Sequence, residues 1–127
     1  HANALCVVGR VDEALVVINQ AQELAETTGH RTYLAEVYRV KGHILLQGDA
    51  QHGKAEEYFL KAIDVAKSQD AKSWELRAAT SLARLWQSQG NTAAAHDLLA
   101  PVYNWFTEGF DTKDLKDAKA LLDELES

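Results

Sequence analysis

GNTAAAHDLLAPV, residues 90–102, places a small residue at Ala95 and a large apolar residue at Leu99, after an opening glycine. The same alternation of small and large residues begins at Ala14 and at Ala55, so it repeats about every 40 residues. A fixed period of this length is typical of stacked pairs of antiparallel helices. Such repeats bury their apolar faces against their neighbours and leave an extended surface open for binding. We therefore expect an all-α fold built as a right-handed stack of helical hairpins.

Composition favours one acidic, helical domain. The 127 residues are 46% hydrophobic, which supplies enough apolar surface for a single core. Lys and Arg number 13 against 19 Asp and Glu, the net charge is −6, and no block of basic residues occurs. Because nucleic acids and anionic membranes attract basic surfaces, we expect neither to be a direct partner.

The chain carries no sign of export or of membrane insertion. No apolar run approaches the roughly 18 residues that span a bilayer, and no signal-peptide pattern opens the sequence. The single cysteine, Cys6, cannot form an internal disulfide, and a reducing cytoplasm is the expected location. The sequence contains no Met and starts at His1, so we expect a C-terminal fragment of a longer protein.

Helical periodicity divides the chain into about seven helices, with no alternating pattern that predicts a strand. Gly9 is expected to close a first segment over residues 2–8, and Asn91 to cap a later helix. The final helix is expected to begin after Asp111 or Thr112. The other expected helices cover residues 11–27, 32–47, 54–68, 72–89 and 92–106.

The expected domain is a single unit with a capping helix at its end. One apolar stripe on the final helix, formed by Leu115, Ala118, Leu122 and Leu125, suits a helix that covers the exposed end of a stack. The expected divisions are a partial repeat over 1–29, repeats over 30–69 and 70–108, and the capping helix over 109–127.

Small residues at the repeat positions are expected to lie at helix crossings. Ala55, Ala83 and Ala95 should be buried there, because close approach leaves no room for a longer side chain. Phe59 and Trp86 occupy positions that pack between helices, and a core role is expected for both.

Aromatic residues gather near the end of the third repeat. Tyr103, Trp105 and Phe106 are too close in sequence to share one helical stripe, so at least one should be partly exposed or covered by the final helix. Pro101 lies within the same helical pattern, where it lacks a backbone donor and predicts a kink near Asp97.

Two stretches carry the repeat most clearly: Leu82-Ala83-x2-Trp86-x3-Gly90-x4-Ala95-x3-Leu99 and Tyr38-x2-Lys41-Gly42-x2-Leu45. Both resemble the tetratricopeptide (TPR) family, in which a small residue lets two antiparallel helices approach. The second departs from the pattern at Lys41, where an apolar residue is usual, and at Gly48, which comes one residue early. The period also exceeds the usual TPR length of about 34 residues, so longer helices are expected. The resemblance implies a TPR-like solenoid that ends in a capping helix.

A narrower resemblance covers residues 71–86 and 98–112. These stretches look like the extreme C-terminus of large bacterial signalling proteins. Such proteins join a class III adenylate/guanylate cyclase or a winged-helix regulator domain to a P-loop ATPase and then to a TPR tail. The resemblance implies the context of this domain and not an activity, because the chain has no cyclase aspartates and no phosphate-binding loop.

Catalytic and metal-binding patterns are weak. The five histidines show no i, i+4 pairing, and none is spaced with Cys6 as zinc ligands are. No Gly-x-Ser-x-Gly elbow occurs, and the acidic residues fall on polar helix faces. We expect no enzyme activity, no cofactor and no metal, and we expect Cys6 to be a small buried hydrophobe.

The candidate site follows from the phase of the repeats. In TPR arrays the first helix of each hairpin lines the concave surface, and spacings of three and four keep residues on one helix face. The resulting groove is expected to be basic and to take the carboxylates of a peptide, since guanidinium groups pair with them bidentately. The alternative is a solvated face with local Arg–Glu pairs. The partner-binding residues that this phase predicts are Arg39, His43, Gln47, Arg77, Thr80, Arg84 and Gln87, with Glu36 and Ser88 beside them.

These observations favour a non-catalytic protein-interaction or scaffold module. Its partner would be a protein or peptide segment, including other domains of its own full-length chain. The alternative is a sensor that takes a small anionic effector in the same groove and changes the curvature of the stack.

Overall fold

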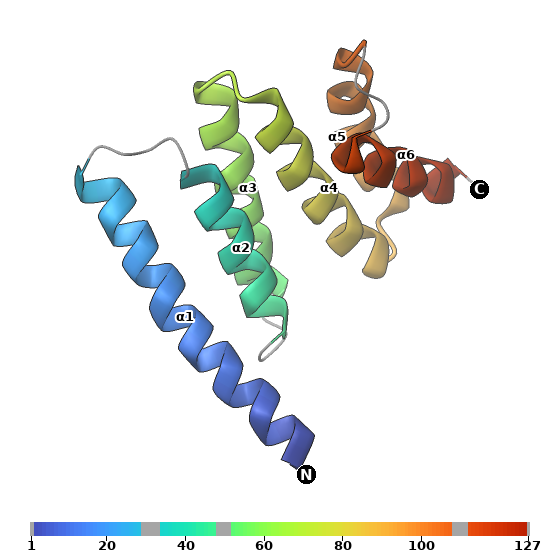
Figure 1. The fold of residues 1–127 in the computed structure, drawn as a ribbon. Helices are drawn as coiled ribbons and strands as arrows, with labels where there is room; N and C mark the ends of the chain where they lie inside the picture. The colour runs from blue at the N-terminus through green and yellow to red at the C-terminus, as the bar shows by residue number, and fades with distance from the viewer. Residues whose placement is uncertain (1, 29–33, 48–51, 108–111, 127) are drawn as a thin grey trace.

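The computed structural model describes residues 2–28, 34–47, 52–107 and 112–126. Within these ranges the chain forms six α-helices and no β-strand, which confirms the expected all-α class (Figure 1). No helix in the described part is long and apolar enough to cross a membrane. The helices are α1 (Ala2–Thr28), α2 (Leu34–Gln47), α3 (His52–Ser68), α4 (Lys72–Ser88), α5 (Thr92–Trp105) and α6 (Lys113–Glu126).

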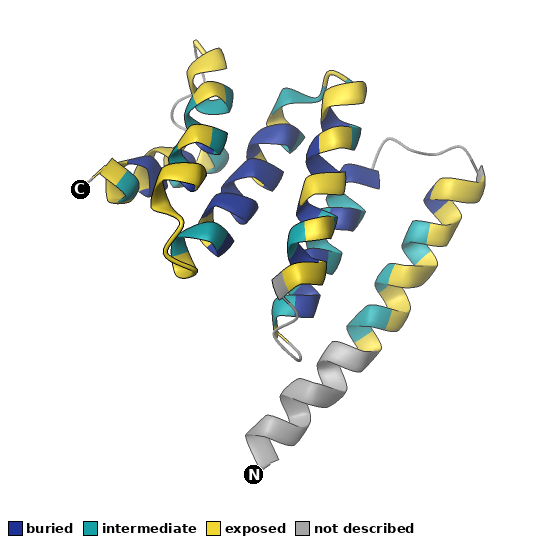
Figure 2. Cartoon of the chain, turned by 180° about the vertical axis from the view of Figure 1, so that it is seen from behind, coloured by how far each residue is buried: buried dark blue, intermediate teal, exposed yellow. Residues whose placement is uncertain are grey.

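Each described helix packs against the next helix in sequence, and α4 also packs against the helices next but one to it. α2 contacts α4 and α4 contacts α6, so these three helices form one layer, while α3 and α5 belong to the other. Among the described elements, α1 contacts only α2, and Figure 2 shows that most of its described surface is exposed or half-buried. The packing is therefore almost entirely between near neighbours in the sequence.

The first helix differs from its prediction. Gly9 was expected to end a short helix, but α1 runs without interruption from Ala2 to Thr28, so the described chain has six helices and not about seven. A glycine within a helix is less favourable than alanine by roughly 1 kcal/mol, and the residues on both sides of Gly9 are compatible with a helix. A single glycine is therefore too weak a signal to end this helix.

The other helix boundaries agree with the predictions to within about two residues, which is the usual spread. Thr32, Gly48 and Asp111 lie outside the described residues. Asn91 stands at the N-cap of α5, but its side chain makes no capping hydrogen bond. Pro101 lies inside α5, which continues to Trp105.

The turns that follow α3 and α4 have the same backbone conformation and the same pattern of hydrogen bonds. Asp70 and Gly90 have positive φ angles of 54° and 84°. In the first turn the N–H of Ala71 bonds to the carbonyl of Ala66 at 2.9 Å, and in the second Asn91 bonds to Trp86 at 2.8 Å. A left-handed residue followed by this bond satisfies the last carbonyls of a helix and reverses the chain tightly. The chain thus returns as an antiparallel neighbour after α3 and after α4.

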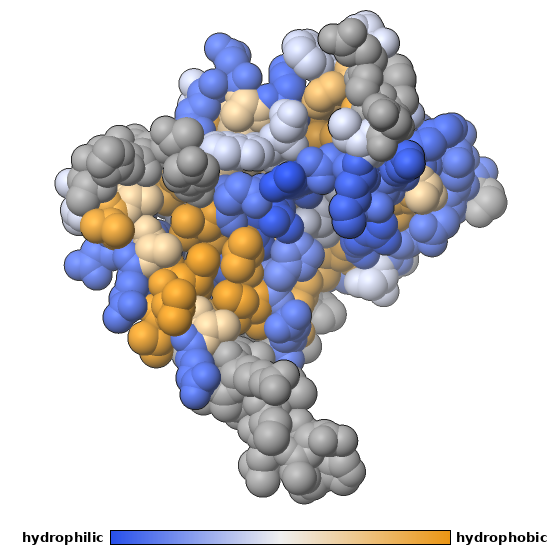
Figure 3. All heavy atoms as spheres, viewed as in Figure 1, coloured by the Kyte–Doolittle hydropathy of each residue, from blue (hydrophilic) through white to orange (hydrophobic). Residues whose placement is uncertain are grey.

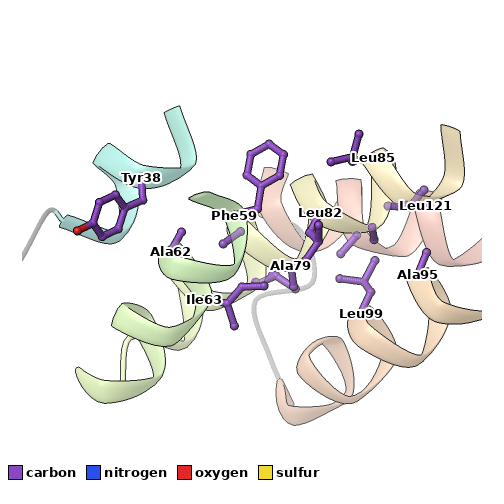
Figure 4. Close-up of a cluster of buried hydrophobic side chains, with 14 of the residues drawn as sticks. Tyr38, Phe59, Ala62, Ile63, Ala79, Leu82, Leu85, Ala95, Leu99 and Leu121 are labelled. Atoms are coloured by element: carbon purple, nitrogen blue, oxygen red, sulfur yellow. The ribbon is translucent and has the colours of Figure 1, made fainter. Parts of the chain in front are cut away.

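The core lies between the two layers (Figure 4). Phe59 and Leu82 are fully buried, and the three alanines of the repeat positions, Ala55, Ala83 and Ala95, are each 0% exposed, as predicted. Trp86 is half-buried against this core, and its indole N–H donates a hydrogen bond to Glu56.

Gly42 of α2 lies in close contact with the ring of Phe59. A Cβ atom at this position would lie 2.5 Å from Cε1 of Phe59 on α3. A side chain at position 42 would therefore force the Phe59 ring to move, and glycine lets the ring pack against this turn of α2.

Lys41 departs from the repeat pattern because it contacts the preceding helix. Its ammonium donates a hydrogen bond to Gln22 of α1 at 3.1 Å and lies 4.4 Å from the centre of the Tyr58 ring. Beside it, the Tyr38 hydroxyl donates to Glu26 of α1 at 2.9 Å. Polar bonds thus join α1 to α2 where the repeat pattern would place an apolar contact.

Replacing Ala83 with leucine should lower the free energy of unfolding by about 1–3 kcal/mol, because the larger side chain overpacks the crossing of α4 with its neighbours. Urea denaturation followed by circular dichroism measures this change. The matched control is Ala94→Leu on the exposed face of α5, where a change within about 0.5 kcal/mol is expected. Equal stability of the Ala83→Leu variant and the parent would show that the crossing is looser than its burial indicates.

Candidate anion-binding groove

The layer of α2, α4 and α6 carries a polar cavity of about 350 Å³. Helical spacing places Arg39 and His43 on one face of α2, and Arg77, Thr80 and Arg84 on one face of α4. These five residues line the same cavity, and Ser81 of α4 joins them. We call this cavity the arginine groove.

α6 forms a third wall of the arginine groove, and the sequence pattern did not predict this wall. Lys113, Asp114 and Asp117, all in its first two turns, line the arginine groove. The i, i+3 spacing of the two aspartates was visible in the sequence, but their direction depends on how α6 packs on α4. Figure 3 shows hydrophilic side chains gathered where α6 lies on the molecule, in contrast to the hydrophobic surface over α1 and α2.

Arg77 joins all three helices of the layer. Its Nε donates to Oδ2 of Asp114 on α6 at 2.8 Å, and its Nη1 lies 3.3 Å from Oε2 of Glu36 on α2. The hydrogen bond and charge of Asp114, followed by the charge of Glu36, raise the pKa of Arg77. Arg77 is 42% exposed, so each pair stabilises the fold by less than about 1 kcal/mol.

Glu36 lies between two arginines. Its carboxylate accepts bonds from Arg39 at 2.9 and 3.2 Å as well as the contact from Arg77. Burial raises the pKa of Glu36, but the hydrogen bonds and charges of Arg39 and Arg77 outweigh burial and hold this pKa below its ordinary value. Glu36 is therefore ionised at neutral pH and neutralises part of the positive charge.

Arg84 is the least engaged arginine of the groove. It makes no hydrogen bond or ion pair with any side chain in the described part of the chain. Asp117 lines the same cavity, and its pKa is lowered first by the hydrogen bond from Lys113 at 2.8 Å and then, more weakly, by the charge of Arg84. Arg84 thus offers a guanidinium that an incoming anion can reach.

His43 and Ser81 form the floor of the groove. The Nε2 atom of His43 lies 2.8 Å from the Ser81 hydroxyl, and its ring meets Phe59 edge-on at 5.1 Å. Burial, followed by the charge of Arg39, lowers the pKa of His43, so the ring is mainly neutral at pH 7.

The His43–Ser81 pair lacks the third group of a catalytic triad among the described residues. Ser81 is 7% exposed, and no described side chain is hydrogen-bonded to the other ring nitrogen of His43. A catalytic base normally has such a partner to orient it. The contact is best explained as a hydrogen bond that satisfies a buried hydroxyl.

Four of the residues that the sequence predicts for this surface do not line the groove, and Glu36, which pairs with Arg39 and Arg77, is one of them. Gln47 and Gln87 lie one turn beyond His43 and Arg84, and Ser88 donates its hydroxyl to the carbonyl of Leu85 at 2.6 Å. Thr80 does line the groove, although its hydroxyl already donates to the carbonyl of Leu76 at 2.8 Å.

The charges around the groove nearly balance. Arg39, Arg77, Arg84 and Lys113 face the carboxylates of Glu36, Asp114 and Asp117, and this leaves one positive charge in excess when His43 is neutral. The local Arg–Glu pairing that the sequence left open is therefore present, together with a cross-helix pair to α6. An anion that enters must compete with these carboxylates or bind at Arg84.

Comparisons with known proteins place few limits on this chain. No family model and no solved structure matches it. An uncharacterized protein of Rhizobium meliloti (strain 1021) is 29% identical over 85 residues, which are 67% of this chain and 8% of that protein. The chain therefore spans a small part of the length of this relative. The structure itself defines an all-α domain of packed antiparallel helices with a polar groove.

Proposed function

We propose that this chain is a non-catalytic interaction module whose arginine groove docks an acidic segment of a partner protein. The observation that carries the proposal is the convergence of Arg39, Arg77 and Arg84, from two helices of one layer, on a single cavity. Guanidinium groups recognise carboxylates through paired hydrogen bonds, and one cavity with several such groups selects an acidic segment over a neutral one.

The helix packing supports a TPR-like, right-handed solenoid with α6 as its capping helix. In such an array the first helices of successive hairpins meet along the concave surface, as α2, α4 and α6 meet here. Hydrophilic residues cover the outer side of α6, which suits the end of a stack. The much longer bacterial relative is consistent with a module that belongs to a large signalling protein. The partner could then be an ATPase, cyclase or regulator domain of the same full-length chain.

Asp114 already bonds to Arg77 as an external carboxylate would. Its Oδ2 atom accepts the 2.8 Å hydrogen bond from Nε, so a partner that uses Arg77 has to displace a carboxylate of the domain itself. Arg84 has no such competitor at bonding distance in the described structure. We therefore infer that Arg84 makes the first strong contact, and that Asp114 limits the affinity.

Arg84→Ala should weaken binding of a fluorescein-labelled hexaglutamate peptide about tenfold, and Asp114→Asn should strengthen it several-fold. Fluorescence anisotropy gives the association constant of each variant. Both association constants should fall as the salt concentration rises, because salt screens part of the attraction. Lys119→Ala, on the outer face of α6, serves as a charge-matched control that should bind as the parent does. Unchanged binding by Arg84→Ala, with melting temperature intact, would refute docking in this groove.

A small anionic effector is the second candidate, because α6 closes one side of the groove. A cavity of about 350 Å³ falls at the lower end of the range for small-molecule sites, which begins near 300 Å³. Thermal shift with citrate and with inorganic phosphate separates the two candidates. Stabilisation by either ion that is lost in Arg84→Ala, together with no binding of the hexaglutamate peptide, would favour the sensor.

A further inference from the structure

Two further cavities lie on the side of α4 that is opposite the arginine groove. Helical periodicity places Lys72 and Glu75 on the face of α4 roughly opposite Arg77 and Arg84. A cavity of about 840 Å³ opens where the turn between α3 and α4 lies near the end of α5, and one of about 300 Å³ adjoins it between α3, α4 and α5. Lys72 and Trp105 line both of them. We call the two together the Trp105 cleft.

Aromatic side chains form one end of this cleft. Trp105, at the last position of α5, is 57% exposed, and its ring meets Phe106 edge-on at 5.2 Å. Trp74, at the start of α4, lines the same cavity. A tryptophan this exposed, at the wall of a cleft, is the kind of residue that anchors partners at interfaces.

Both cavities of the cleft also carry acidic side chains. Glu75 lines the smaller cavity and is only 3% exposed, and Asp97 lines the same cavity from α5. Asp70 lines the larger one. Asp70 and Asp97 are exposed and make no ion pair with any residue in the described ranges. With Lys67 and Lys72 as the basic residues of the cleft, the carboxylates outnumber the ammonium groups, in a chain of net charge −6.

The position of the Lys72 ammonium indicates that the cleft accepts a cationic group. Its ammonium lies 3.2 Å from Oε1 of Glu75 and 5.4 Å from the centre of the Trp105 ring. A cation therefore already lies between a buried carboxylate and an aromatic face, and it belongs to a side chain that is 33% exposed. A lysine at the first position of a helix can turn its ammonium into water when another cation takes that place.

We propose that the Trp105 cleft binds a basic peptide segment, with an arginine guanidinium inserted between the Trp105 ring and the Glu75 carboxylate in place of the Lys72 ammonium. Arginine suits this position better than lysine, because its planar group stacks on an indole and pairs with a carboxylate at the same time. Asp97 and Asp70 attract further basic residues, and the aromatic end takes an apolar neighbour of the arginine. This surface is separate from the arginine groove and does not depend on its function.

The test uses a fluorescein-labelled peptide of sequence GLRLRG, titrated with the protein in an anisotropy assay. Trp105→Ala should weaken binding about tenfold, since the stacking face is lost. Asp97→Asn should weaken it twofold to threefold. A peptide with citrulline in place of both arginines keeps the shape without the charge and should bind at least tenfold more weakly. Equal binding of the citrulline peptide, or of the Trp105→Ala variant, would overturn the proposal.

Lys72→Met gives the sharper result, because it removes the internal competitor. It should strengthen binding of GLRLRG about threefold, and the peptide should raise the melting temperature of this variant more than that of the parent, since Glu75 regains a cationic partner. Lys116→Met on α6 makes the same change in net charge away from the cleft and should leave the affinity unchanged. Weaker binding by Lys72→Met would contradict the assignment, because it would mean that Lys72 supports the partner and does not compete with it.

Arg84→Ala should leave the affinity for GLRLRG unchanged, so that the outcome is independent of docking in the arginine groove.

Discussion

Phe59→Ala should lower the free energy of unfolding by about 3–5 kcal/mol, because Phe59 is the largest fully buried side chain of the described core. The ring is 0% exposed, extends from α3 into the core and contacts Gly42 and His43 of α2, so its removal should leave a cavity. Urea denaturation followed by circular dichroism measures the loss, provided that the transition is two-state.

Gly42 makes this prediction more specific, because the ring and the glycine fit each other. Gly42→Ala alone should be destabilising by about 1–3 kcal/mol, since its Cβ would lie 2.5 Å from Cε1 of a ring that has no room to move. In the Phe59→Ala background the clash is absent, and the same substitution should be neutral or stabilising by up to about 1 kcal/mol through helix propensity. The double-mutant cycle should therefore give a coupling energy of at least about 1 kcal/mol.

Leu60→Ala is the matched control for Phe59→Ala. Leu60 is the next residue on α3 and is 42% exposed, so its truncation should change stability by less than about 1 kcal/mol. If Gly42→Ala were harmless in the parent protein, the contact between α2 and α3 would be wider than the structure places it.

Leu121→Ala should also be strongly destabilising, with a loss of about 2–5 kcal/mol. Leu121 is 0% exposed and belongs to the apolar stripe by which α6 packs on α4 and α5. Because α6 also forms a wall of the arginine groove, the same substitution should weaken binding of an acidic peptide.

Asp123→Ala provides the comparison for Leu121→Ala on the same helix. Asp123 forms an exposed pair with Lys119 at 2.9 Å, and because water and salt screen such a pair, its loss should change stability little. A similar small effect of Leu121→Ala, measured by the same denaturation, would mean that α6 is only loosely attached in solution.

The sequence predicted the fold well where one local rule decided the outcome. Ala55, Ala83 and Ala95 are buried at crossings, as a small residue with a fixed period requires. Gly9 misled the prediction, because a glycine that ends one helix is tolerated inside another. At Asp70 the sequence failed to indicate a turn that is present. Asp70 has the same left-handed backbone as Gly90, but an aspartate indicates this conformation less clearly than a glycine does.

The candidate site could be predicted only where helical spacing within the sequence determined it. The shared cavity of Arg39, Arg77 and Arg84 follows from helical spacing together with the order of the repeats. The carboxylates of Asp114 and Asp117 could not be assigned to it, because their position depends on the angle at which α6 packs. That angle is set by tertiary contacts of Leu115 and its neighbours and leaves no pattern in the sequence near the arginines.

The pairing of each helix with its neighbours in sequence also bears on how quickly the chain reaches this structure. Folding rates fall as contacts join residues that are farther apart in the sequence, because long loops must close before they are stabilised. Among the residues that the structure describes, the contacts between helices join elements that are adjacent or next but one. Helical domains with such local contacts fold in microseconds to milliseconds, and formation can begin at any hairpin and spread to the next. A short folding time limits how long the apolar stripes of α4 and α6 are exposed to other chains.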